Sequence, residues 1–225
     1  MFKLLYIIYI DSLRKSVLFI LLLLFTICFC FDIITIIGGD TKMNRKEKAP
    51  IAKQTSINYI LLYFLIYAFI GWLLETFYAV STLGHFVKRG FLFGPLCPIY
   101  GWGAIILISS LKKYKSNSLK LFFYSSIVFS IFEYIVGYAL DALFCAKWWD
   151  YTNDFMNLNG RISLFFAFAW GIIAIIFINH IHPFIEKKVK KILNKIPNWL
   201  QVYSIRFAIG IVFIDTVLSS IKYLI

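Results

Sequence analysis

The 225-residue sequence has little charge and few acidic side chains. Only 15% of its residues are charged, and 11 Asp and Glu stand against 23 Lys and Arg. Soluble domains carry about 25% charged and about 45–50% apolar residues, whereas this sequence is 61% hydrophobic and 20% aromatic. The composition therefore excludes a soluble globular domain, a disordered chain and a nucleic-acid-binding module, and it indicates a membrane protein.

Residues that carry out chemistry are also scarce. The sequence has three histidines and four cysteines, with no H-E-x-x-H string and no Cys/His cluster, so it supports no metal site. It contains no glycine-rich ATP-binding loop and no nucleophile signature. We therefore expect no bound cofactor and name no catalytic residue, although an enzymatic activity stays open below.

Long apolar runs are what the sequence does contain. A membrane helix needs about 20 apolar residues. Six runs approach that length: Ser16–Ile37, Ile57–Val80, Phe91–Leu111, Leu121–Phe144, Ile162–Ile181 and Ile205–Tyr223. They predict an all-α, polytopic bundle of about six transmembrane helices, a five-helix core plus one N-terminal helix. Residues 1–10 are too short to span and are expected to lie at the interface.

The basic residues alternate between the connecting segments. Segments 38–56, 81–90, 112–120, 145–161 and 182–204 hold five, two, four, two and five Lys or Arg. Because loops rich in Lys and Arg stay in the cytoplasm, we predict that 81–90 and 145–161 lie outside a bacterial cell (inner) membrane, crossed in several passes. Residues 182–201 predict a basic amphipathic helix that either lies on the inner interface or docks a cytoplasmic partner.

Acidic residues inside the apolar runs are the main functional candidates. There are five: Asp32, Glu75, Glu133, Asp141 and Asp215. A carboxylate at the bilayer centre costs at least about 2.5 kcal/mol, so these residues form either a substrate or ion path or polar staples between helices. Glu133, Gly137 and Asp141 share one helix face at i, i+4 and i+8. With Glu75 they predict a polar seam that opens to the outer face.

The run Phe91–Leu111 is the least helix-like of the six. Irregular backbone at membrane depth survives only when it is buried in protein or lines a cavity, and broken helices often form transporter binding sites. A simple proline kink is the alternative. The residues of this broken-helix motif are Gly90, Gly94, Pro95, Cys97, Pro98, Tyr100 and Gly101.

The two outer loops supply charge and aromatic rings. Their arginines can pair with the acids, hold a substrate's carboxylate or phosphate, or snorkel to the interface. The candidate substrate-binding or polar-path residues are Glu75, Arg89, Glu133, Asp141, Asp150, Asn157, Asn159 and Arg161. The candidate aromatic rim comprises Trp72, Trp148, Trp149 and Tyr151, which an ordinary aromatic belt would also explain.

Three strings carry a family resemblance: GWLLE at Gly71–Glu75, RGFLFGPLCPIYGWG at Arg89–Gly103, and WWDY followed by NLNGRIS. Over roughly residues 57–183 the chain resembles the bacterial ABC-transporter permease family of the CmpB type, also called ABC-transporter type IV. Lys88 departs from the Asn expected there. The resemblance implies a polytopic permease that works with a separate ATPase subunit, and it transfers no residue roles.

Three regions follow from these patterns. Residues 1–56 hold the interfacial segment, one transmembrane helix and a basic loop; 57–183 form the family-like membrane core; 184–225 hold the basic amphipathic loop and the last helix. The expected function is a permease subunit of an ABC-type transporter, in contact with the lipid bilayer and an ATPase subunit, with a homo-oligomer left open. The alternatives are a membrane enzyme acting on a lipid-linked substrate at the outer leaflet, and a non-transporting assembly or regulatory factor.

Overall fold

The computed structural model describes residues 51–224, with side chains from Ile57 onward, and the predicted span Ser16–Ile37, with Asp32, lies outside them. Apart from an isolated β-bridge between Leu158 and Ile162, the regular elements in the described part are helices. They are α2 (Ile51–Leu83), α3 (Pro98–Ile106), α4 (Ser118–Phe144), α5 (Leu164–Ile176), α6 (His182–Leu193) and α7 (Asn198–Leu224). Two π-helical segments, η1 (Leu107–Leu111) and η3 (Phe177–Ile181), and the 3-10 turn η2 (Lys112–Tyr114) extend α3 and α5.

Four helical stretches are long and apolar enough to cross a membrane: Ile57–Leu83, Ser118–Phe144, Leu164–Leu193 and Asn198–Leu224. They confirm four predicted spans in the described residues. The fifth run is longer than predicted because it continues without a break through η3 and α6. The last run begins earlier than predicted, at Asn198.

The predicted span Phe91–Leu111 is not among these four, so the expected count of about six is not confirmed. Residues 84–97 are not helical, and α3 begins only at Pro98. Proline suits the first helical position, because its missing N–H would have no helical partner there. Glycine and proline thus shorten this helix from its N-terminal side.

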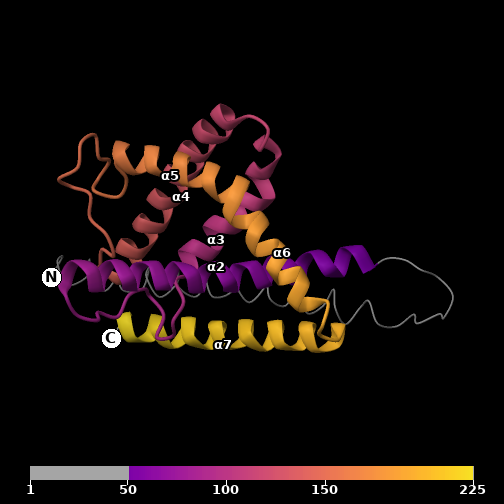
Figure 1. Cartoon of the computed structure of the whole chain (residues 1–225). Helices are drawn as coiled ribbons and strands as arrows, with labels where there is room; N and C mark the ends of the chain where they lie inside the picture. Colours follow the sequence, from indigo (N-terminus) through magenta and orange to yellow (C-terminus); the bar gives the residue numbers. More distant parts are fainter. Residues whose placement is uncertain (1–50, 225) are drawn as a thin grey trace.

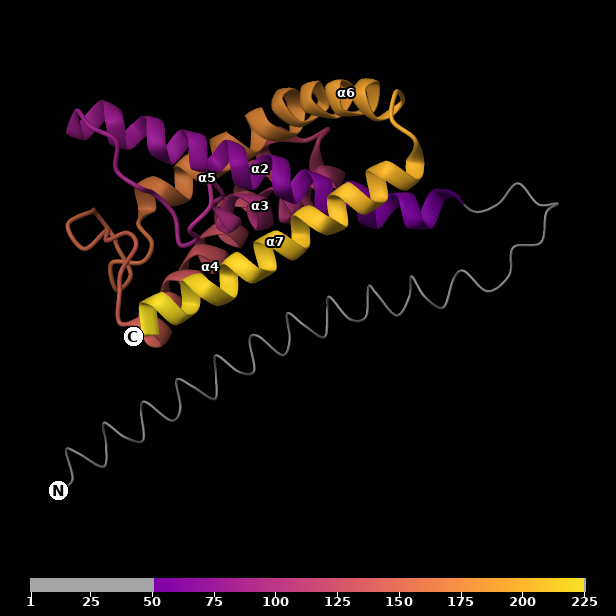
Figure 2. The same ribbon diagram turned by 90° about the horizontal axis from the view of Figure 1, so that it is seen from below.

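α2 packs against α3 and, less extensively, against α7. Figure 1 shows α4 and α5 on one side of α2 and α7 on the other. In the view from below in Figure 2, α2 and α7 lie in front of α4 and α5. The most extensive contacts join α4 to α5 and α2 to α3. The close approach of α2 and α3 depends on glycine, since a Cβ at Gly101 would lie 2.6 Å from the Phe64 ring. Small residues serve this purpose between membrane helices generally.

The segment between α2 and α3 turns back into the bundle. The Cys97 N–H donates to the Ala68 carbonyl at 2.9 Å. Ala68 lies 15 residues before Leu83, which is about 22 Å along the helix. Residues 84–97 therefore return as irregular backbone to the middle of α2, and α3 with η1 continues toward the opposite end.

Candidate functional site

We call the end of the bundle formed by residues 84–97 and 145–163 the loop end, and the opposite end, formed by η2 and α6, the basic end. Most predicted site residues lie toward the loop end. They come from α2, α3, α4 and the two loops, so their geometry depends on how these elements pack.

Glu133 of α4 is buried, with 6% of its surface exposed. Its Oε1 accepts a hydrogen bond from the Tyr151 hydroxyl and its Oε2 accepts one from the Trp170 indole N–H, both at 2.9 Å. Tyr151 stacks on Phe166, and Trp170 stacks on Phe129. Both oxygens are thus bonded by rigid, packed donors, as a buried carboxyl group requires.

Glu75 of α2 is half buried and accepts a hydrogen bond from the Tyr100 hydroxyl of α3 at 2.5 Å. The Tyr100 side chain lies against Gly71, one helical turn before Glu75, where a Cβ would overlap it. Gly71 therefore makes room for the ring whose hydroxyl reaches Glu75. This contact fixes the broken-helix motif to α2.

The carboxylates of Glu133 and Glu75 both influence the phenol of Tyr151. Burial, together with the carboxylates of Glu133 and Glu75, raises the pKa of Tyr151 above its ordinary range. The hydroxyl therefore keeps its proton and remains a hydrogen-bond donor. Tyr151 and Tyr100 provide one phenol for each of the two acids.

Arg161 pairs with Asp141, as one of the sequence alternatives predicted. Its Nη2 lies 2.7 Å from Asp141 Oδ2. The guanidinium lies 5.6 and 5.4 Å from the ring centroids of Tyr134 and Tyr138, within reach of a cation–π interaction. The Arg161 carbonyl also accepts the Trp149 indole N–H at 2.9 Å.

Gly137 provides the space for this arrangement. A Cβ at this position would lie 3.1 Å from the Trp149 ring and 3.5 Å from the aliphatic part of Arg161. The glycine between the two acids of α4 therefore receives the loop 145–163 rather than another helix.

The other polar residues of that loop shape the loop itself. Asp150 accepts hydrogen bonds from the Thr152 N–H and hydroxyl, and these bonds lower its pKa. Asn157 donates to the carbonyls of Thr152 and Asp154 and accepts from the Gly160 N–H. Gly160 adopts φ 68°, which favours glycine. These contacts leave Asp150 and Asn157 committed to the turn.

Asn159 and the aromatic residues also contact protein. Asn159 donates to the Tyr134 hydroxyl at 3.0 Å. Trp148 packs with Phe91 and Tyr223, joining the two loops to the end of α7. Trp72 stacks on Phe69 within α2. The predicted rim residues therefore lie in separate packing environments.

Arg89 differs from Arg161. Within residues 51–224, Arg89 makes no ion pair, and its buried Nε has no hydrogen-bond partner. Its neighbour Lys88 lies over the Phe93 ring, 4.5 Å from the centroid. The Nε of Arg161 is likewise buried without a partner, so the two arginines differ in that Arg161 forms the ion pair with Asp141 and Arg89 forms none within the described residues.

Asp215, one of the five acids predicted to form a path or a polar staple, has partners that the sequence did not indicate. Its two oxygens accept the N–H groups of Phe93 and Gly94 at 2.8 and 2.7 Å, and Ser219 also donates to it. A carboxylate of α7 therefore satisfies the backbone of the irregular segment. The glycines and prolines predicted irregular backbone, but no local signal pairs it with a residue so distant in sequence.

A second polar cluster at the basic end was also missed. His182 is 1% exposed, and its Nδ1 shares a hydrogen bond of 2.9 Å with the Tyr67 hydroxyl. The ring stacks on Phe177 and meets Tyr63 edge-on. The tyrosine repeat at 59, 63 and 67 could have indicated one polar helix face, but not its histidine partner.

Comparison with known protein families identifies the family of this chain. The family model described as "Putative ABC-transporter type IV" matches residues 62–220. Searches of curated proteins and of solved structures found no match. The matched range extends past residue 183 into α6 and most of α7, so it includes Asp215 as well as both loops.

Proposed function

Because the chain belongs to the ABC-transporter type IV family, we propose that it is the membrane-spanning permease subunit of an ABC-type transporter in the bacterial cell membrane. A separate ATP-hydrolysing subunit would drive it. Four apolar helices of membrane-spanning length support this proposal.

The observation that carries the proposal is the irregular segment 84–97 inside the bundle. It is held by the Cys97–Ala68 backbone bond, by Asp215 and by the neighbouring Tyr100–Glu75 contact. Broken backbone of this kind places polar main-chain groups at membrane depth, where transporters bind their substrates. A few contacts connect the segment to two different helices, so its position can respond to their movement.

In this proposal the polar path opens at the loop end, and its residues have different tasks. Glu133, Asp141 and Arg161 are bonded within the protein and form its walls. Glu75 and Arg89 are the candidates for direct substrate contact. Glu75 uses one oxygen for Tyr100, while its second oxygen has no hydrogen bond within the described residues. Arg89 Nε is similarly unused.

The internal bonding of Glu133 and Asp141 also favours a second function. If these acids only join helices, the chain is a non-transporting assembly factor that holds another membrane protein. A polar staple needs satisfied partners and no opening. The two functions differ in whether Glu75 and Arg89 matter for activity when the fold is intact.

Affinity purification of the full chain from its own membrane tests the proposal. We expect an ATP-hydrolysing subunit to co-purify, with ATPase activity that falls in Glu75→Gln while chain levels stay normal. Asp150→Asn, a change at the same end within the loop turn, serves as the control for charge loss. Co-purification of other membrane proteins without any ATPase would favour the assembly factor and contradict the permease.

A further inference from the structure

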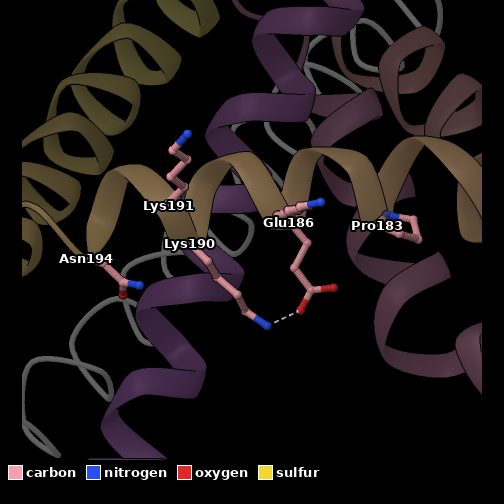
Figure 3. Close-up of a pocket in the computed structure, with 6 residues that line it drawn as sticks. Pro183, Glu186, Lys190, Lys191 and Asn194 are labelled. Carbon is pink, nitrogen blue, oxygen red and sulfur yellow. Dashed lines mark hydrogen bonds and ion pairs between the residues drawn. The ribbon is translucent and has the colours of Figure 1, made fainter.

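A shallow, open hollow of about 490 Å³ lies on the surface of α6 at the basic end. It is lined by Pro183, Glu186, Lys187, Lys190, Lys191 and Asn194. Figure 3 shows Glu186, Lys190 and Asn194 extending to one side of α6 and Lys191 to the other. The opposite face of α6 packs inward, since Ile185 and Val189 contact the core cluster. The hollow therefore belongs to a fixed surface of the helix.

The hollow has an excess of positive charge. Its single acid, Glu186, lies 2.7 Å from Lys190 Nζ and 3.9 Å from Lys112 Nζ. Within the described residues, Lys187 and Lys191 take part in no ion pair. Two lysines and the Asn194 amide thus offer donors without an internal acceptor.

A second basic segment meets this surface. The Lys112–Glu186 contact places residues 112–120 beside α6. Segments 112–120 and 182–197 together contain nine lysines and one acidic residue. Folding therefore concentrates two basic stretches that are far apart in the sequence, and a complementary ligand must be anionic.

The hollow is also adjacent to apolar surface of membrane-spanning type. α6 ends the span Leu164–Leu193, and the next span begins at Asn198. Phe184, Ile192 and Trp199 are exposed at 64%, 58% and 63%. Lys188 Nζ lies 5.5 Å from the Phe184 ring centroid. Lysine and aromatic side chains at the end of a span are typical of the lipid headgroup region.

We propose that this hollow binds the phosphate-bearing headgroup of an anionic phospholipid. Lys187, Lys191 and Asn194 donate to the phosphate, while Glu186 holds Lys190 at the edge. The acyl chains lie along the exposed apolar residues of α6 and α7. A phospholipid fits better than an acidic protein because charge and apolar surface occur side by side between two spans.

Thermal unfolding and native mass spectrometry of the full chain in neutral detergent test this proposal. We expect phosphatidylglycerol to raise the Tm and to remain bound, and phosphatidylcholine with the same acyl chains to do neither. Lys187→Gln/Lys191→Gln should weaken phosphatidylglycerol binding by about tenfold or more, with an unchanged Tm in lipid-free detergent. The matched control, Lys88→Gln/Lys147→Gln at the loop end, should bind as the original chain does.

Three results would overturn the proposal. Equal weakening in both double variants would mean that general charge attracts the lipid. Equal stabilisation by inorganic phosphate would mean a phosphate site without lipid specificity. Stabilisation by polyglutamate but not by phosphatidylglycerol would assign the surface to an acidic protein. If the α6 variant has a lower Tm without lipid, the variant Asn194→Ala must itself weaken lipid binding for the proposal to stand.

Discussion

At the scale of residues, the polar side chains of the bundle differ in how fully they are bonded. Glu133 has a donor on each oxygen, whereas Glu75 has one donor in all. The sequence predicted both as buried acids, because a charge in an apolar run is unmistakable. It could not predict their partners, since Tyr151 and Trp170 come from a loop and another helix, 18 and 37 residues away.

This difference predicts that the same substitution destabilises the chain at Glu133 but not at Glu75. Glu133→Gln places an amide N–H₂ against a buried donor, and an unsatisfied buried group costs about 1–3 kcal/mol. Glu75→Gln still accepts from Tyr100 through its amide oxygen. We expect a lower Tm in detergent for Glu133→Gln and little change for Glu75→Gln. Equal Tm values for the two variants would contradict this account of Glu133.

Arg161 and Asp141 should be energetically coupled. Their contact is direct and partly buried, and hydrogen bonds to charged groups contribute about 1.5–3 kcal/mol. Arg161→Ala and Asp141→Ala should each destabilise the chain, and the double variant should lose less than the sum of the two. Thermal or denaturant unfolding of all four proteins measures the coupling. Strict additivity would show that the pair is not a unit.

At the scale of elements, the irregular segment 84–97 decides the architecture. Its glycines and prolines allowed the sequence to predict a broken helix, but the apolar count alone made Phe91–Leu111 look like a full span. The helix in this run begins only at Pro98. The residues before it are irregular backbone that is hydrogen-bonded to Ala68 and Asp215. Those partners lie on other helices, so sequence periodicity could not reveal them.

Loss of the Asp215 carboxylate should release this segment. In Asp215→Asn, an amide N–H₂ replaces an oxygen that accepts the N–H of Phe93 or Gly94. Cys97, the buried last residue of the segment, should then react faster with a maleimide in a chain whose other three cysteines are serine. Asp150→Asn in the same background should leave the rate unchanged. An unchanged rate in Asp215→Asn would mean that the Cys97–Ala68 and Tyr100–Glu75 contacts hold the segment without the Asp215 carboxylate.

At the scale of the whole molecule, the predicted alternation of lysine-rich and lysine-poor segments still fits the fold, although Phe91–Leu111 does not form a full membrane-spanning helix. The sequence predicted that Phe91–Leu111 crosses the membrane as a helix. In the structure, the irregular segment followed by α3 and η1 still takes the chain from the loop end to Lys112 at the basic end. The predicted sidedness of the loops therefore does not depend on a continuous third helix. The contact between η2 and α6 could not be predicted from the sequence, because the ion pair between Lys112 and Glu186 joins segments that are far apart in the chain.

Cysteine labelling tests the orientation that this alternation predicts. In a cysteine-free chain in intact cells, Asn153→Cys at the loop end should react with a membrane-impermeant maleimide. Lys191→Cys at the basic end should react only after the membrane is permeabilised, because basic loops stay in the cytoplasm. Both positions are exposed. The reverse pattern, or reaction of both in intact cells, would refute the orientation.

The bond between Asp215 and the irregular segment also sets an order of biogenesis. Asp215 lies 122 residues after Phe93, so at about 5–20 residues per second the ribosome needs roughly 6–24 s to supply the acceptor. Until then the N–H groups of Phe93 and Gly94 lack their partner, and apolar surroundings make such groups costly. The segment therefore reaches its final place after α7 has been inserted. In a chain truncated before α7, the N–H groups of this segment would stay without their acceptor, and cellular quality control should recognise such a chain.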